Sequence, residues 1–103
     1  MSRIFAETSF NGDISTWDVS GVTDMNNMFM RATSFNRDIS KWDVSKVKNM
    51  DRMFLHAKSF NQQLCGPFWI RSRASKELMF HGSARSQKMR TVCTLTPLSL
   101  IHI

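Results

Sequence analysis

The sequence lacks the features that mark several classes of protein. No stretch approaches the ~20 apolar residues of a membrane-spanning helix, and residues 1–5 contain no apolar run of the length a secretory signal needs. There is no glycine-rich phosphate loop and no Asn-x-Ser/Thr acceptor for N-glycosylation. No serine has a histidine and an acid in a triad-like relation. We therefore expect no membrane span, no cofactor and no catalytic set in this chain.

Cysteine is absent from residues 1–64 and occurs only as Cys65 and Cys93. The three histidines show no ligand spacing around these cysteines, so a metal site is not expected. We predict instead a Cys65–Cys93 disulfide, which closes a loop of about 28 residues and contributes on the order of 3 to 4 kcal/mol in the loop-entropy model. Two unrelated thiols are the alternative.

Charge of one sign dominates only the end of the chain. The 103 residues form one small domain with a net charge of +6. Residues 1–64 hold eight Lys and Arg against seven Asp and Glu, whereas residues 65–103 hold six against one. The basic stretch from Arg71 to Arg90 has no aromatic interleaving, so we interpret it as a solvated surface and expect no nucleic-acid partner.

Two adjacent copies of one 25-residue segment make up the middle of the chain. Residues 10–34 and 35–59 are identical at 15 of 25 positions, and a third copy opens at residues 60–64. Self-similarity at a short fixed period indicates units that stack along one axis and bury their apolar faces on each other. Because the same residues recur in each copy and no copy has catalytic groups of its own, we do not expect an enzyme.

The apolar positions of the repeat predict how one copy folds. β-forming residues separated by polar ones suit short strands, and Met25, Met28, Phe29 and Ala32 have the spacing of a helical turn. We predict an α/β solenoid, similar to leucine-rich repeats, of about three coils in which short parallel strands alternate with short helices or 3₁₀ turns. Its expected parts are a partial coil (1–9), two coils (10–34 and 35–59), the start of a third (60–64), a degenerate coil and C-terminal cap (65–94), and a tail outside the native fold (95–103).

Stacking in register would place equivalent polar residues above one another. Asn11, Asn36 and Asn61 should form a ladder of amides that bond to neighbouring backbone. Asp18 and Asp43 precede Val-Ser and should accept backbone N–H groups in Asx turns. A metal site at these two acids is the alternative, but no calcium-loop pattern accompanies them.

Trp17 and Trp42 occupy the same repeat position, and we predict that both lie inside, one over the other. An exposed aromatic strip for carbohydrate is the alternative. The positions that vary between copies should face solvent. Those that become basic form the candidate binding face: Arg37, Lys41, Lys46 and Lys48.

The segment Phe-Asn-x-Asp-Ile-Ser-x-Trp-Asp-Val-Ser-x-Val-x-x-Met-x-x-Met-Phe resembles the repeat of BspA-type surface proteins. The resemblance covers residues 10–64 closely and residues 1–9 with a one-residue deletion. It implies a leucine-rich-repeat-like fold and an extracellular or cell-surface scaffold for adhesion or protein binding. It carries over no catalytic residue.

The resulting functional hypothesis is a repeat scaffold that binds a protein or glycan at a cell surface. Ladder-type binding of polysaccharide or ice by the regular face is the alternative. Residues 1–5 match residues 50–54 in type, so we expect a piece of a longer surface or secreted protein, with a first coil whose open edge favours self-association.

Overall fold

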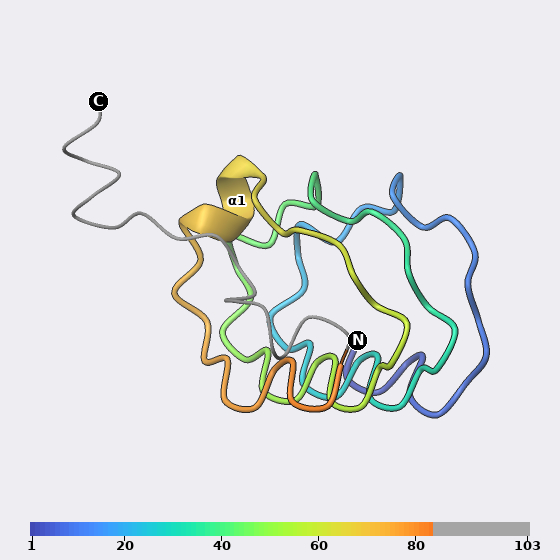
Figure 1. Cartoon of the computed structure of the whole chain (residues 1–103). Coiled ribbons are helices and arrows are strands. Elements are labelled where there is room, and N and C mark those ends of the chain that lie inside the picture. Colours follow the sequence, from blue (N-terminus) through green and yellow to red (C-terminus); the bar gives the residue numbers. More distant parts are fainter. Residues whose placement is uncertain (84–103) are drawn as a thin grey trace, which may run out of the picture.

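A computed structural model of the chain describes residues 1–83. In that part the chain runs through successive turns of similar outline that lie side by side (Figure 1). The described residues contain one helix, α1 (Pro67–Ile70), and no strand. Two isolated parallel bridges, Asp24 to Asn49 and Asn49 to Ser75, join neighbouring turns. No helix among residues 1–83 has the length and apolar character needed to cross a membrane.

The predicted α/β solenoid of alternating short strands and helices is wrong. Residues 1–83 form a compact body with almost no regular secondary structure, since a four-residue helix and isolated bridges are all that is present. The two halves of the repeat fail to become regular elements for different reasons: hydrogen-bond acceptors close to the backbone N–H groups in the first half, and backbone conformation in the second.

Asx turns replace the predicted strands. In each copy an aspartate Oδ1 accepts the N–H of the serine two residues later, as Asp18 does from Ser20 at 3.0 Å and Asp43 from Ser45 at 3.0 Å. Between these turns the chain reverses through short-range backbone bonds, for example from Val22 N–H to the Val19 carbonyl. These local acceptors compete with the bonds between neighbours that a strand requires.

Left-handed residues prevent the predicted helical turns. Asn27 and Arg31 have φ of 57°, and Arg52 and His56 repeat this conformation with φ of 57° and 56°. A helix cannot contain such residues, because each residue of a right-handed helix needs a negative φ. The spacing of Met25, Met28, Phe29 and Ala32 therefore reflects successive tight turns that point these side chains inward.

Backbone hydrogen bonds connect each of these turn segments to the next. In the second segment the N–H groups of Asn27, Phe29 and Arg31 donate to the carbonyls of Asp51, Met53 and Leu55 at 2.7 to 3.0 Å. In every such bond the acceptor lies about one repeat length later in the sequence than the donor. The four segments consequently lie next to one another (residues 2–7, 26–31, 51–56 and 77–82; Figure 1).

Two columns of phenylalanine rings run through the core between the turns. The rings of Phe29 and Phe54 are 5.2 Å apart and nearly parallel, and Phe54 and Phe80 are also 5.2 Å apart. A second column runs beside the first, and the two are in contact at each turn, for example at Phe29 and Phe35, 4.1 Å apart, and at Phe54 and Phe60, 4.0 Å apart. The first column contains Phe5, Phe29, Phe54 and Phe80, and the second contains Phe10, Phe35 and Phe60. Stacked rings contribute about 0.5–1.5 kcal/mol per pair beyond their buried area.

The prediction that Trp17 and Trp42 both lie inside is correct for only one of them. Trp42 is 2% exposed, and its Nε1 donates to the Ile14 carbonyl of the preceding turn at 3.0 Å. Trp17 belongs to the first described turn, where no earlier turn covers it, and it is 42% exposed. Ile4 is also exposed at this end. Self-association through this edge stays a prediction.

Helix α1 brings a displaced tryptophan into the regular site. Pro67 occupies the first turn, where its missing N–H leaves no bond unmade. Trp69 is then fully buried, and its Nε1 donates to the Ile39 carbonyl at 2.9 Å, as Trp42 does to Ile14. The third repeat therefore keeps the tryptophan contact although Trp69 stands two places late in the sequence.

The Asx turns make stability sensitive to acid. Hydrogen bonds lower the pKa of five carboxyls below the usual 3.8. Asp13, Asp18, Asp38 and Asp43 accept the N–H and hydroxyl of the serine two residues later, and Asp51 accepts the Ser75 hydroxyl and the Glu77 N–H of the next turn. Groups with a depressed folded pKa stabilise the fold above the unfolded pKa of about 3.9, and this stabilisation is lost as the pH falls through the folded values.

We therefore expect the urea midpoint to be lower at pH 3 than at pH 6. A variant with asparagine at all five positions keeps the Oδ1 acceptors, so its midpoint should change less over the same range. Equal midpoints for the native protein at pH 3 and pH 6 would show that these bonds do not favour the charged form.

Several predictions concern residues beyond the described part of the chain. Cys93, the tail at 95–103 and the part of the cap after Ser83 lie outside residues 1–83. Cys65 lies within them and is not a free thiol. The Cys65–Cys93 pairing stays a prediction.

Candidate functional site

Two hollows open on the surface of the described residues. The larger, named here the basic hollow, has a volume of about 590 Å³ and is lined by Thr23, Ser45, Lys46, Val47, Lys48, Arg71 and Arg73. The smaller, the mixed hollow, has a volume of about 310 Å³ and is lined by Asp13, Ser15, Arg37, Asp38 and Lys41. The predicted binding face is thereby divided, since Lys46 and Lys48 line one hollow and Arg37 and Lys41 line the other.

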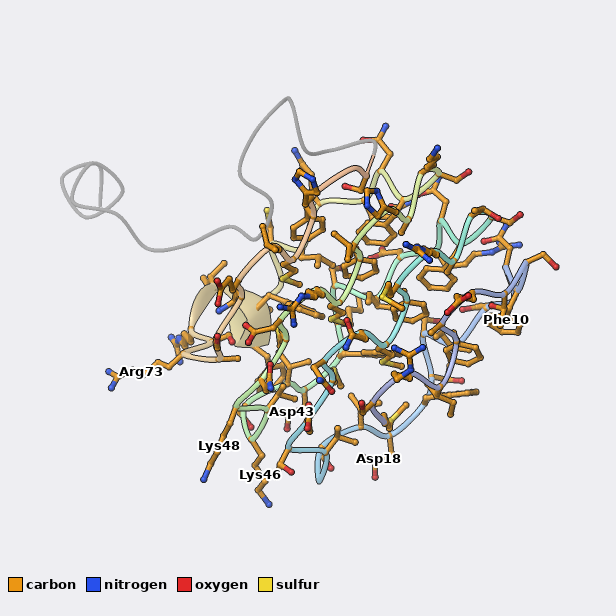
Figure 2. The ribbon with its side chains drawn as sticks, turned by 90° about the horizontal axis from the view of Figure 1, so that it is seen from below. Phe10, Asp18, Asp43, Lys46, Lys48 and Arg73 are labelled. Atoms are coloured by element: carbon orange, nitrogen blue, oxygen red, sulfur yellow. The ribbon has the colours of Figure 1, made fainter. Side chains whose placement is uncertain are left out.

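Backbone bonds between three successive turns hold the basic hollow in shape. The Lys48 N–H donates to the Thr23 carbonyl at 2.8 Å, and the Lys48 carbonyl accepts from the Ser75 N–H at 3.0 Å. Between the two lysines Val47 points inward and is 5% exposed, so the lysine side chains on either side of it project outward. Figure 2 shows Lys46, Lys48 and Arg73 extending away from the body of the protein on the same side.

Two of the four cations were missed by the sequence interpretation. Arg71 and Arg73 belong to the basic stretch that we interpret from the sequence as a solvated surface, because no aromatic interleaving accompanies it. They nevertheless stand one full repeat length after Lys46 and Lys48, and each pair is separated by a single residue. The repeat spacing itself was therefore the signal that could have found them, since equivalent positions of stacked turns become neighbours.

The positive charge of the basic hollow is largely uncompensated. No Asp or Glu lines it, and the described residues contain one ion pair, Arg3 with Glu7 at 3.4 Å, which involves none of the four cations. All eight acidic residues of the sequence lie within residues 1–83. Asp43 interacts with one of the four cations, since the charge of Lys46 lowers the pKa of its carboxyl, although hydrogen bonds from Ser45 lower it more.

The mixed hollow differs from the basic hollow in its charge. Asp13 and Asp38 line it beside Arg37 and Lys41, so both signs of charge are present. The Arg37 Nε also donates to the Asn11 carbonyl of the previous turn at 2.9 Å. Part of the predicted binding face therefore connects turns and faces carboxylates, and its net charge is close to zero.

The asparagine ladder is engaged with the backbone. The Asn36 N–H donates to Asn11 Oδ1 at 2.9 Å, and the Asn61 N–H donates to Asn36 Oδ1 at 2.8 Å. Gln62 Nε2 donates to the same Asn36 oxygen at 3.0 Å. These amide oxygens thus act between turns and satisfy backbone donors that no regular sheet covers.

Asp18 and Asp43 lie on neighbouring turns and on the same side of the protein (Figure 2). Each accepts a serine hydroxyl at 2.6 Å in addition to the serine N–H. Among the described residues, no group of three or more His, Cys, Asp or Glu side chains gathers in one place. In this structure each of the two carboxylates stabilises the turn to which it belongs.

The fold and its surface define a small protein of stacked, in-register repeats with a basic hollow formed across successive turns. The chain belongs to the family described as "Mycoplasma protein of unknown function, DUF285", which matches residues 1–92. No curated protein and no solved structure matches the chain. The resemblance to BspA-type surface proteins stays a hypothesis.

Proposed function

We propose that this chain is a non-catalytic scaffold that binds a protein or glycan at a cell surface, outside the cell, through the basic hollow. The observation that carries the proposal is the group of four cations, two from each of two successive turns, around one cavity that no carboxylate lines. Unpaired like charges repel one another and destabilise a compact fold. A negatively charged partner would remove that repulsion, so the arrangement favours an anionic ligand.

The stacked turns support a binding role because they hold the surface groups on a rigid frame. The backbone beside Lys48 is bonded to the turn before and the turn after it. A frame with little freedom loses little entropy when a ligand binds. The same core residues recur in each turn, while the outer positions differ, as Thr23 and Lys48 do.

The alternative of polysaccharide or ice binding by the ladder receives less support from the contacts. A ladder that matched a lattice would need amide oxygens open to the ligand. Oδ1 of Asn11 and Oδ1 of Asn36 already accept backbone N–H groups. The four cations of the basic hollow form no ion pair among the described residues, whereas the amide oxygens of the ladder already accept hydrogen bonds within the fold.

The proposal is tested by binding of the fluorescently labelled protein to intact microbial and animal cells and to extracellular matrix. We expect saturable binding to at least one of these surfaces and a loss of at least tenfold in affinity for the double variant Lys46→Glu/Lys48→Glu. The matched control, Lys41→Glu/Lys58→Glu, makes the same change in net charge outside the basic hollow and should stay within threefold of the native protein. Absence of saturable binding, or equal losses in the two variants, would refute the proposal.

A further inference from the structure

We infer that the basic hollow binds an acidic polysaccharide, meaning a linear glycan that carries carboxylate or sulfate groups. The inference rests on the proposed function and names the chemical class of its ligand. It is drawn from the arrangement of the charges, from the side chains between them and from the kinds of group that the hollow lacks.

The charges form an extended array. Lys46 and Lys48 come from one turn, and Arg71 and Arg73 come from the next. The array therefore extends both along a turn and across the stack, over a cavity of about 590 Å³. A single small anion would neutralise one or two of these cations, whereas a polymer with a negative group on successive units would neutralise all four. The distribution of charge thus favours a polyanion.

The other lining groups suit sugar rings. Thr23 and Ser45 bring hydroxyl groups to the hollow, and Val47 forms part of its floor. The Ser45 hydroxyl donates to Asp43 at 2.6 Å, which leaves its oxygen lone pairs as acceptors for a sugar hydroxyl. Sugars carry hydroxyl groups on every ring, so hydroxyls in the wall of the hollow are complementary to them.

The missing groups argue against single-stranded nucleic acid. Proteins that hold single-stranded nucleic acid stack its bases on aromatic side chains, and each base contributes about 1–3 kcal/mol in this way. The basic hollow has no aromatic lining, and the nearby Trp42 and Trp69 are buried in the core with their Nε1 groups bonded to backbone. A polyanion without bases is the better match.

The two kinds of cation have different roles in this arrangement. A guanidinium presents paired donors that match a carboxylate or sulfate in a bidentate contact, whereas a lysine ammonium acts as a point charge. We expect Arg71 and Arg73 to orient the acidic groups of the glycan and the lysines to supply attraction without fixed geometry. Arg71→Lys/Arg73→Lys, which conserves charge, should therefore weaken binding by about threefold to tenfold.

The test measures the affinity of the full chain for five probes by biolayer interferometry: hyaluronate, dextran sulfate, unmodified dextran, single-stranded oligothymidine and polyglutamate. We expect binding to hyaluronate or dextran sulfate that weakens as salt rises from about 50 to about 500 mM, and no binding to unmodified dextran. Lys46→Glu/Lys48→Glu should reduce the affinity at least tenfold, and Lys41→Glu/Lys58→Glu less than threefold. All four exchanged lysines are exposed, so both variants should fold, which a cooperative thermal unfolding transition checks.

The outcomes separate this inference from the proposed function. Binding to oligothymidine or polyglutamate as tight as to the acidic glycans would overturn the polysaccharide assignment. So would failure of both acidic glycans to bind. If cell-surface binding were still lost in Lys46→Glu/Lys48→Glu, the hollow would remain the contact site and only the ligand class would be wrong. If that variant bound every surface and probe like the native protein, both proposals would fail.

Discussion

Replacing Phe54 with alanine should lower the free energy of unfolding by about 3–5 kcal/mol, the range for a buried phenylalanine. The Phe54 ring is fully buried and stacks on three others, with centroids 5.2 Å from Phe29, 4.0 Å from Phe60 and 5.2 Å from Phe80. Its removal leaves a cavity in the middle of the first phenylalanine column, and the rings of Phe29 and Phe80 on either side lose their shared partner. Small domains have a total free energy of unfolding of about 5–15 kcal/mol, so this one substitution should remove a large fraction of it.

Phe10→Ala is the matched control. Phe10 lies in the same kind of column but at its first turn, where it is only partly buried. Because less apolar area is removed from water there, we expect a cost of at most about half that of Phe54→Ala. Urea denaturation followed by tryptophan fluorescence measures both values. Similar losses in the two variants would mean that the columns do not carry the stability that their geometry implies.

Gly66→Ala should destabilise the protein by at least about 1–3 kcal/mol, the usual range for overpacking, and should weaken acidic-polysaccharide binding as well. A Cβ at Gly66 would lie 1.8 Å from the Ser40 carbonyl oxygen and 2.9 Å from the Ser40 carbonyl carbon. Gly66 has φ of −64° and ψ of 162°, which alanine adopts readily, so the cost is steric. The backbone before α1 must move away from Ser40.

That movement should reach the binding site. Helix α1 begins directly after Gly66 and positions Trp69, whose Nε1 is bonded to the Ile39 carbonyl at 2.9 Å. Arg71 caps the C-terminal end of the helix and lines the basic hollow. A shifted α1 therefore strains the tryptophan contact and displaces the arginine pair relative to the lysines.

Gly21→Ala is the control for this prediction. The same methyl group at Gly21 would meet no heavy atom within 4 Å, so we expect a change in melting temperature close to zero and unaltered affinity for dextran sulfate. Thermal unfolding and biolayer interferometry of both variants provide the comparison. If Gly66→Ala melted and bound like Gly21→Ala, the close approach of the backbone at Ser40 would be contradicted.

The choice of core residues could be predicted from the repeat, but their secondary structure could not. The repeats are expected to bury their apolar faces on each other, and apolar residues of the repeat such as Phe29, Met53 and Phe54 are buried. The expected strand and helix failed because apolar spacing reports which side chains point inward, and a series of tight turns can produce the same spacing as a helix. The left-handed φ of Arg31 has no counterpart in the sequence, since arginine has no preference for that region, whereas Asn27 is a residue type that adopts it more readily.

The sequence predicted two of the four cations that line the basic hollow. Lys46 and Lys48 were found because they differ from Gly21 and Thr23 in the copy before. Arg71 and Arg73 were not, because the third copy departs from the pattern and Trp69 stands late in it. Their 25-residue distance from the lysines pointed to this neighbourhood, and α1 together with the bond from the Ser75 N–H to the Lys48 carbonyl shows that the two turns do lie side by side there.

By itself, the sequence determined that equivalent positions recur with the period of the repeat, that apolar positions turn inward and that Asx turns follow the tryptophans. These properties depend on composition and on local hydrogen bonds within a few residues. The tertiary structure alone decided that the N–H groups of the turn segments bond to the next turn, that Trp17 is exposed while Trp42 is buried, and that four cations surround one hollow. Each of these depends on which segment lies beside which, and such contacts join residues that are remote in the sequence.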